Sequence, residues 1–413
     1  MRRVVITGMG VISPLGNTLA DYWEGLKAGR CGIGFITKFD PCESKVKIAA
    51  EVRDFDPALY MEKSEVRKTD LFAQYAMAAA VQAVADSALE MRDPRRLGVY
   101  MASGIGGLNT LMAEHQKLLE KGMRWVSPHF IPMMISNIAA GNIAIRFHAT
   151  GPCLPVVTAC ATSSHAIGEA FRAIKHGYAD AVIAGGSDAV INPLSVAGFT
   201  NCMALSVKND PGQSSIPFDK RRDGFVIGEG AGALILEEYE RAKARGARVY
   251  AEIAGYGNTC DAYHVTAPRP ESECAAEAIR LAMEEAGLGA DCAKRLYINA
   301  HGTGTPLNDK AETLAVKRAL GEAAYDVLVS STKSMTGHML GAAGAAEAIA
   351  SVKALGEGVV PPTIGYAEPD PECDLDIVPN RAREAKLCAA LSLSLGFGGH
   401  NACLAFVKAD REA

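Results

Sequence analysis

The chain has 413 residues, 49% hydrophobic and 22% charged, a composition typical of a globular protein. Its 42 lysines and arginines are outnumbered by 47 aspartates and glutamates, which argues against a nucleic-acid-binding protein. No apolar run approaches the length of a membrane span or an export signal, so we expect a cytoplasmic protein that does not enter a membrane. The 11 cysteines lie singly, without the CxxC pairs of structural zinc sites and redox dithiols.

Short runs of valine, isoleucine and leucine alternate with alanine-rich helical patterns, which predicts an α/β protein with buried strands. In chain order, we expect strands at Arg3–Thr7, Leu97–Ala102, Pro155–Thr158, Ala181–Ala184, Ala231–Glu237, Val249–Gly255, Arg295–Asn299 and Val327–Ser330. We expect helices at Asp70–Ser87, Ser164–His176, Glu273–Ala286, Asp309–Leu320 and Leu340–Leu355. The C-terminal end predicts a hairpin of Cys388–Ser394 and Ala402–Val407 around a glycine-rich turn.

A weak repeat relates two segments of the chain. Val156–Cys160 and Leu328–Lys333 each begin as an apolar strand and continue into a polar loop, a helix and a further strand. The repeat predicts two similarly built halves that meet near residue 250, with their loops facing each other.

Cys160 ends a predicted strand and lies shortly before the predicted helix Ser164–His176. The positive end of a helix dipole favours the thiolate form of a cysteine at this place. Such a turn also leaves backbone N–H groups free to bind an oxyanion. Cys160 is therefore a candidate nucleophile, although most free cysteines are small buried side chains, and the other ten lack this setting.

The segment His301-Gly302-Thr303-Gly304-Thr305 directly follows a predicted strand, at the end where α/β sheets bind ligands. Hydroxyls at Thr303 and Thr305 suit an amide-bearing ligand, and the alternative is a turn around a hydrogen-bonded histidine. Asp309 and Glu312 have the spacing of a capping box, and for Asp309 we expect helix capping.

Two further loops carry polar side chains. Lys333 and His338 lie five residues apart in a loop that leads into a Gly/Ala-rich helix, and that helix must pack closely against its neighbours. The turn Gly396–Gly399 places three glycines around Phe397, so its backbone can approach a ligand. One thiol, two histidines and one lysine, all in loops, suit carbon–carbon bond formation on thioesters, which needs no metal or redox cofactor.

With these four motifs in order, the chain resembles the β-ketoacyl-[acyl-carrier-protein] synthases, the condensing enzymes of type II fatty acid synthesis. The resemblance runs from Val4 to Asn401, which is nearly the whole chain. It implies the thiolase fold, a duplicated five-layer α-β-α-β-α sandwich, and a homodimer. Residues 1–250 would form the half that carries the nucleophile, and residues 251–413 the half that carries the histidines.

The resemblance also implies catalytic roles. Cys160 matches the residue that becomes acylated, and His301 and His338 match the pair that binds the malonyl thioester and promotes its decarboxylation. Lys333 matches the lysine of the catalytic site, and Glu312 matches its buried carboxylate partner. The backbone N–H groups of Cys160 and Phe397 would form the oxyanion hole.

Binding roles follow from the same resemblance. The matching substrate-binding residues are Thr303 and Thr305 for the phosphopantetheine arm, Ile105 for the acyl-pocket gate, Phe130 as a pocket residue lent by the second subunit, and Gly398 in the glycine turn. The basic residues that match docking positions for an acyl carrier protein are Lys63, Arg67, Lys68 and Arg124. No metal and no resident cofactor are implied, because phosphopantetheine arrives on the carrier protein.

The chain departs from the family pattern in two places. It reads Ala161-Thr162-Ser163-Ser164 where the family often has a glycine, and Ser392-Leu393-Ser394-Leu395 where Asn-Ser-Phe is usual. These departures put the shape of the acyl pocket in question, and with it the chain-length preference and the pathway.

Three related classes fit less well. A degradative thiolase uses a second cysteine as base, but Cys403 lies beyond the glycine turn. A chain-initiating synthase carries asparagine in place of His338, and a non-catalytic chain-length partner lacks Cys160. The alternative that stays open beside fatty acid elongation is the catalytic ketosynthase subunit of a type II polyketide or specialised lipid pathway.

Overall fold

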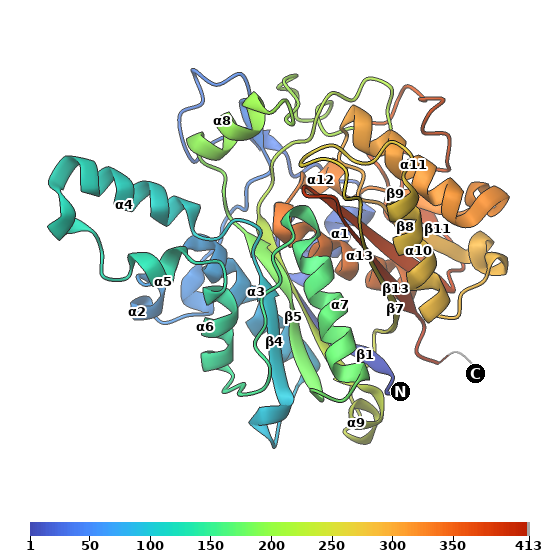
Figure 1. The fold of residues 1–413 in the computed structure, drawn as a ribbon, viewed down its shortest axis with the longest axis horizontal. Coiled ribbons are helices and arrows are strands. Elements are labelled where there is room, and N and C mark those ends of the chain that lie inside the picture. The colour runs from blue at the N-terminus through green and yellow to red at the C-terminus, as the bar shows by residue number, and fades with distance from the viewer. Residues whose placement is uncertain (411–413) are drawn as a thin grey trace.

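Two half-sheets form the centre of the molecule in the computed structural model, which describes residues 1–410 (Figure 1). The first half-sheet has the spatial order β4 (Leu97–Ala102), β5 (Ala181–Asp188), β6 (Gly230–Glu238) and β1 (Val4–Ile12). The second has the order β7 (Ala251–Cys260), β13 (His400–Val407), β12 (Ala389–Gly396), β8 (Leu296–Asn299) and β9 (Leu328–Ser330). Because β1 pairs with β7 over Val4–Ile6, the two halves join into one nine-stranded sheet.

The helices form three layers around these half-sheets. The outer layers are α3 (Leu71–Ser87), which packs on β1 and β6, and α10 (Glu273–Glu285) with α11 (Pro306–Leu320), which cover the second half-sheet. The middle layer is α7 (Thr162–Lys175) and α13 (Ala343–Glu357), which contact strands of both halves. This alternation confirms the predicted five-layer α-β-α-β-α sandwich.

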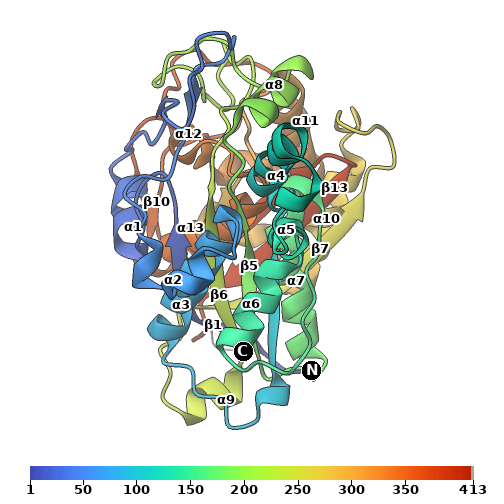
Figure 2. The ribbon, with the colours of Figure 1, turned by 90° about the vertical axis from the view of Figure 1, so that its left-hand side faces the viewer.

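The remaining helices lie outside these layers, apart from α12 (Lys333–Thr336), which is fully buried. The outer ones are α1 (Leu19–Lys27), α2 (Lys63–Val66), α4 (Leu108–Lys121), α5 (Phe130–Met134), α6 (Ile138–Arg146), α8 (Pro193–Asn201) and α9 (Tyr239–Ala244). The short strands β2 (Gly34–Phe35), β3 (Ile48–Ala49), β10 (Val359–Val360) and β11 (Arg383–Glu384) form two small ribbons. Helices α4 and α5 project from the body in Figure 1, and Figure 2 shows that side from the front.

The duplication is visible in the topology. The second half contributes five strands, which are β7, β8, β9, β12 and β13 in chain order. From the outer edge of the sheet to its centre, the third of these strands comes first, followed by the second, fourth, fifth and first. The first half repeats this order with β1, β4, an isolated bridge at Cys153, β5 and β6. The same winding in both halves explains the weak repeat in the sequence. The division at residue 250 into two domains stays a prediction.

The predicted strand at Pro155–Thr158 does not form. The chain pairs with β4 only where Cys153 bridges Val99, and the segment after it has no regular strand. Pro155 has no N–H to donate to a ladder, and Val157 is 49% exposed at this edge of the sheet. The first half therefore lacks the full counterpart of β9.

None of the helices within residues 1–410 is both long enough and apolar enough to cross a membrane.

Helix ends differ slightly from the sequence prediction. Helix α7 begins at Thr162, before the expected Ser164, and α11 begins at Pro306, before the expected Asp309. Proline favours the first turn of a helix because its fixed φ suits that turn and no N–H is lost there.

Candidate active site

Cys160 lies in a single 3₁₀ turn, Ala159–Ala161, that runs directly into α7. Ala159 has a φ of 51°, in the left-handed region that a residue with a Cβ seldom adopts. The glycine turn packs against this strained turn, and a Cβ on Gly396 would lie 3.3 Å from the Cys160 backbone nitrogen. Cys160 is half-buried and lies beside Phe397, so the predicted partners of the oxyanion hole are close together.

The expectation that the helix start favours a thiolate at Cys160 is wrong for the free thiol. Burial raises the pKa of Cys160 to about 11, although the charge of Lys333 and a hydrogen bond from the Phe397 backbone lower it. Removal from water thus outweighs the favourable neighbours. Near neutral pH the side chain rests as a thiol, and it needs a proton acceptor when it reacts.

The two histidines meet although they lie 37 positions apart in the sequence (301 to 338). His301 follows β8, His338 follows α12, and their ring centroids are 5.4 Å apart at an angle of 85°. Burial and the nearby charge of Lys333 hold the pKa of both rings well below its usual value. Both histidines are therefore neutral at physiological pH.

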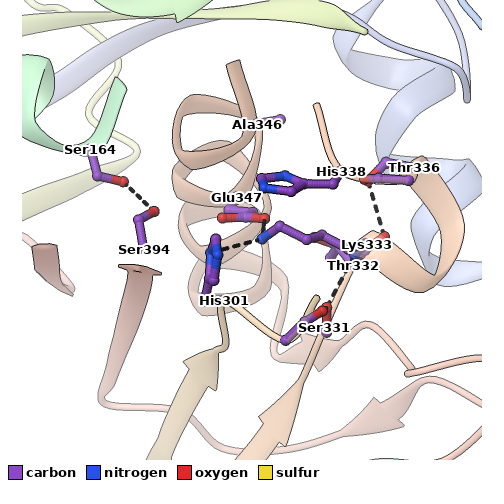
Figure 3. A network of polar contacts seen from close by, with 12 residues as sticks. Ser164, His301, Ser331, Thr332, Lys333, Thr336, His338, Ala346, Glu347 and Ser394 are labelled. Carbon is purple, nitrogen blue, oxygen red and sulfur yellow. Dashed lines mark hydrogen bonds and ion pairs between the residues drawn. The ribbon is translucent and has the colours of Figure 1, made fainter. Parts of the chain in front are cut away.

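The neighbours of each ring determine which nitrogen carries the proton. The Leu340 N–H donates to Nδ1 of His338 at 3.3 Å. Figure 3 shows the second contact, in which the Lys333 ammonium faces Nδ1 of His301 at 3.4 Å. Because Nδ1 acts as acceptor in both rings, Nε2 carries the hydrogen in both. Nε2 of His338 has no hydrogen-bond partner among the described residues, so this donor is free for a ligand.

Lys333 forms an ion pair with Glu347 of α13, not with Glu312 (Figure 3). The expected pairing with Glu312 is wrong because that carboxylate is taken up by backbone groups. It accepts hydrogen bonds from the N–H groups of His301 at 2.5 Å and Gly302 at 2.7 Å. Burial raises the pKa of Glu312 to about 7. Glu312 therefore fixes the loop that carries His301.

Sequence reasoning missed Glu347. It is the only charged residue between Leu340 and Val352, in a helix that was expected to pack closely. A carboxylate in such a helix is buried, and a buried carboxylate requires a cation or several donors. The lone carboxylate in a closely packed helix could therefore be noticed in the sequence. Its pairing with Lys333 could not, because the sequence does not show which side chains lie close together.

Asp309 does not cap the start of α11. The helix begins at Pro306 with Thr305 as its N-cap residue, so Asp309 lies inside the first turns. Its carboxylate accepts hydrogen bonds from the backbone of Phe218 at 2.7 Å and of Gly304 at 3.2 Å. Asp309 therefore holds the threonine loop against the segment at 218 and does not act as a helix cap.

A pocket of about 360 Å³ opens onto these groups. The predicted site residues that line it are Cys160, His301, Thr303, Thr305, His338 and Phe397. The threonine hydroxyls lie 3.0 Å apart on its wall. Sequence reasoning missed its apolar lining, which includes Phe199, Met203, Phe225, Leu307 and Leu395. These residues come from segments without a polar motif to mark them.

Three of the expected substrate residues do not line this pocket. Ile105 lies in a loop after β4 and is 39% exposed. Phe130 begins α5 on the projecting side of the molecule, and Gly398 donates its N–H to Val265 at 2.7 Å. Their roles stay predictions.

The expected docking residues lie away from the pocket of their own chain. Lys63, Arg67 and Lys68 are exposed on and just after α2, and Arg124 is exposed beyond α4. None of the four forms an ion pair with a described residue. In both Figure 1 and Figure 2, α2 is well separated from α8 and α11, whose residues line the pocket.

The departures from the family pattern occupy the interior. Ser163 accepts a hydrogen bond from the Ala345 backbone at 2.8 Å, and Ser164 pairs with Ser394 at 2.8 Å (Figure 3). These contacts connect α7 with α13 and β12. Leu393 is buried in the outer core of the second half, whereas Leu395 lines the pocket.

The arrangement supports acyl transfer and enolate chemistry. A thiol beside backbone N–H groups can take an acyl group as a thioester. Two neutral imidazoles that present Nε2–H can stabilise negative charge on a carbonyl oxygen. Among the described residues, no group of three histidine, cysteine, aspartate or glutamate side chains is arranged to hold a metal ion.

Comparison with known proteins identifies the family. The β-ketoacyl synthase N-terminal domain matches residues 1–242, and the β-ketoacyl synthase C-terminal domain matches residues 250–367. The chain is 52% identical over 410 residues to the 3-oxoacyl-[acyl-carrier-protein] synthase 2 of Synechocystis sp., with 98% of each chain covered.

Solved structures agree. The ishigamide ketosynthase/chain length factor has a TM-score of 0.92 and 38% identity, with 98% of this chain and 99% of that chain covered. A ketosynthase in complex with its type II PKS acyl-carrier protein and bound to a hexaketide has a TM-score of 0.89 and 34% identity, with 99% and 100% covered. The duplicated sandwich, the buried histidine pair beside a thiol and these full-length matches lead to one conclusion: the chain belongs to the β-ketoacyl synthase family.

Proposed function

We propose that this protein condenses an acyl group, held on Cys160, with malonyl-[acyl-carrier-protein] to give 3-oxoacyl-[acyl-carrier-protein] in fatty acid elongation. The observation that supports this most directly is the placement of Cys160, His301 and His338 around one pocket, with Nε2–H as the free donor of His338. The 52% identity to a 3-oxoacyl-[acyl-carrier-protein] synthase 2 over nearly the full chain supports the same reaction.

The first half-reaction is acyl transfer. The sulfur of Cys160 attacks the carbonyl carbon of the acyl thioester, and its proton passes to the departing pantetheine sulfur. The oxyanion that forms accepts hydrogen bonds from the backbone N–H groups of Cys160 and Phe397. The charge of Lys333 and the Phe397 N–H lower the pKa of the Cys160 thiol, so they favour the thiolate during attack.

The second half-reaction is decarboxylative condensation. Nε2–H groups of His301 and His338 donate to the thioester carbonyl oxygen of the malonyl group. The carbon–carbon bond to the malonyl carboxylate breaks and CO₂ leaves. The electron pair of that bond stays on the α-carbon and forms an enolate. The enolate carbon attacks the acyl carbon on Cys160, and the cysteine sulfur leaves as a thiolate that takes a proton from water. Lys333 holds the acceptor nitrogen of His301 and thereby keeps Nε2 protonated.

The substrate arm and the carrier protein fit the same site. Thr303 and Thr305 line the pocket, where their hydroxyls suit the amides of phosphopantetheine. One structural neighbour is a ketosynthase in complex with its acyl-carrier protein. We therefore propose an acyl carrier protein as partner, no resident cofactor, and action in the cytoplasm.

A homodimer is part of the proposal. Large apolar side chains are exposed on and around the projecting helices, among them Leu119, Met123, Trp125, Ile131 and Ile145. The incomplete sheet edge after Cys153 adds Leu154 and Val157. We propose that a second copy of the chain covers these exposed apolar side chains. In such a dimer, Phe130 and the basic residues around α2 would serve the pocket of the second subunit.

The alternative is the ketosynthase subunit of a type II polyketide or specialised lipid pathway. One solved neighbour, at 34% identity, is a ketosynthase in complex with its type II PKS acyl-carrier protein, and another, at 38% identity, is a ketosynthase/chain length factor. Leu395 also gives the pocket wall a different shape from the usual phenylalanine. The identity of 52% to a synthase of the fatty acid type favours elongation.

The deciding experiment offers the purified protein malonyl-[acyl-carrier-protein] with a series of acyl primers and follows 3-oxoacyl products by mass spectrometry. Condensation of saturated primers of graded length supports fatty acid elongation. Turnover confined to poly-3-oxo primers supports the polyketide alternative. Absence of any 3-oxoacyl product with a folded parent protein would contradict both.

A further inference from the structure

Asp188, the last residue of β5, is a fully buried carboxylate that the proposed chemistry does not use. It forms no ion pair with a described residue, and its partners are N–H and O–H groups. Burial raises the pKa of Asp188 to about 6, whereas these hydrogen bonds lower it. A buried carboxylate without a cation is costly, so its donors must be held in place.

One oxygen of Asp188 serves the loop after β4. Oδ1 accepts hydrogen bonds from the Ser103 hydroxyl at 2.7 Å and from the Ile105 N–H at 3.3 Å. The same Ser103 oxygen accepts from the Gly106 N–H at 2.8 Å. The conformation of the loop that carries Ile105 therefore depends on this carboxylate.

The other oxygen reaches the turn that follows His338. Oδ2 accepts hydrogen bonds from the N–H groups of Gly341 at 2.7 Å and Gly104 at 3.2 Å. The residue before Gly341 is Leu340, whose N–H donates to Nδ1 of His338. Two successive N–H groups thus connect the carboxylate to the ring, and the second of them sets the tautomer of His338.

The two segments also touch each other and the turn of Cys160. A Cβ on Gly341 would lie 2.5 Å from the Gly104 nitrogen, so only a glycine at 341 allows this contact. A Cβ on Gly104 would lie 3.3 Å from the Ala159 carbonyl oxygen, next to Cys160. Asp188 is therefore at the point where the three loops meet.

We propose that Asp188 is a positioning residue that fixes two parts of the site at once: the loop of Ile105 at the acyl gate and the turn that orients the imidazole of His338. This inference rests on the proposed function, which assigns those two roles. A shared anchor means that the acyl pocket and the decarboxylation site are adjusted together.

The test uses the full-length protein with small pantetheine thioesters, so that carrier docking does not enter. Asp188→Ala removes both oxygens. Decarboxylation of malonyl-pantetheine should fall roughly ten- to a hundredfold, since hydrogen bonds to a charged group are lost. Self-acylation of Cys160 by a short acyl thioester should change less than about threefold, because its oxyanion donors stay in place.

Two milder variants separate the arms. Asp188→Asn keeps one acceptor oxygen and should lie between the parent and Asp188→Ala in decarboxylation. Ser103→Ala removes one donor of the gate loop only, so it should shift the acyl chain-length profile and leave decarboxylation within about twofold. These variants keep the inference testable if Asp188→Ala does not fold.

Equal loss of decarboxylation and self-acylation in the Asp188 variants would overturn the inference, because a merely structural role lowers both. An unchanged chain-length profile in Ser103→Ala would also overturn it. Failure of the parent protein to decarboxylate malonyl-pantetheine would instead contradict the proposed function.

Discussion

The two halves of the molecule use the same turn for different purposes. In the first half, Ala159 with a φ of 51° opens a 3₁₀ turn that leads into α7, and the next residue is Cys160. In the second half, Leu340 with a φ of 51° opens the equivalent turn into α13, and the next residue is Gly341. The duplicated frame therefore offers the position of the thiol twice.

The space around each position explains the difference. The side chain of Cys160 borders the pocket, whereas a Cβ on Gly341 would collide with Gly104 and Asp188. The second half instead places its reactive groups in the longer connection between β9 and the turn, which holds Lys333 and His338. One half thus uses the turn to present a side chain, and the other uses it to pack the loops that the site needs.

The largest expected effect is on the turn of the first half. Cys160→Ala should lower condensation more than about a thousandfold, because it removes the nucleophile. Its free energy of unfolding should stay within about 1 kcal/mol of the parent, since the side chain is half-buried beside a pocket. The rate of product formation from acyl and malonyl thioesters measures condensation. Urea unfolding measures the free energy of unfolding. Retention of more than about a hundredth of the activity would refute the assignment.

The histidines test whether the second half supplies the donors. His301→Ala or His338→Ala should each lower malonyl decarboxylation by about a hundred- to a thousandfold, as expected for removal of a donor to a developing oxyanion. Self-acylation of Cys160 should stay measurable by mass spectrometry of the intact protein. A variant that decarboxylates normally and fails only in acylation would reverse the roles.

The protonation state of the same rings makes a prediction about pH. Because the pKa of His301 and of His338 is depressed, decarboxylation should not fall through titration of these rings between about pH 8 and about pH 6. The folded protein binds fewer protons than the unfolded chain below the usual histidine pKa of about 6.5. The contribution of these rings to stability is therefore present above about pH 6.5 and is lost as the pH falls below it.

The buried ion pair of the second half should respond strongly to the loss of one partner. Glu347→Leu leaves Lys333 without its carboxylate and should lower the free energy of unfolding by about 3–5 kcal/mol. The double variant Lys333→Met with Glu347→Leu removes both charges and should lie closer to the parent. Chemical denaturation of the parent, Glu347→Leu, Lys333→Met and the double variant gives the coupling free energy between the two side chains. If the losses of the two single variants add up to the loss of the double variant, the ion pair contributes nothing to stability.

Gly341→Ala is the counterpart of the cysteine substitution. Its Cβ would lie 2.5 Å from the Gly104 nitrogen, so the backbone must shift at a cost of about 1–3 kcal/mol. Thermal unfolding measures this loss. Gly356→Ala is the matched control, because nothing lies within 4 Å of a Cβ there. Equal stability of the Gly341 variant and the control would mean that the second turn is not a packing device.

The smallest expected effect concerns docking. Arg67→Glu with Lys68→Glu should raise KM for carrier-bound substrate several-fold at low salt, because both side chains are exposed and would attract an acidic partner. Salt screens this attraction, so the effect should shrink as the ionic strength rises. KM for a pantetheine thioester should not change. Loss on both substrates would indicate a damaged fold, and loss on neither would place docking elsewhere.

The sequence predicted those features that depend on local hydrophobic patterns and short motifs. The four loops, the α/β class and most strands follow from hydrophobic runs and from residues such as Cys160 and His338. It could not predict that Glu347 pairs with Lys333, because that contact depends on how α13 crosses the loop. The predicted strand at Pro155–Thr158 does not form because Pro155 has no N–H to donate to β4 and the segment is exposed at the edge of the sheet. Asp188 carries no motif at all.

The pairing of β1 with both β6 and β7 has a consequence for synthesis. Val4 pairs with Glu238 and with Ile253, so β1 has no partner strand until more than half of the chain has followed it. At about 5–20 residues per second, the nascent strand waits on the order of ten seconds or more. Only α3, which packs on β1 and follows it within the first 87 residues, can cover the apolar side chains of β1 during that time.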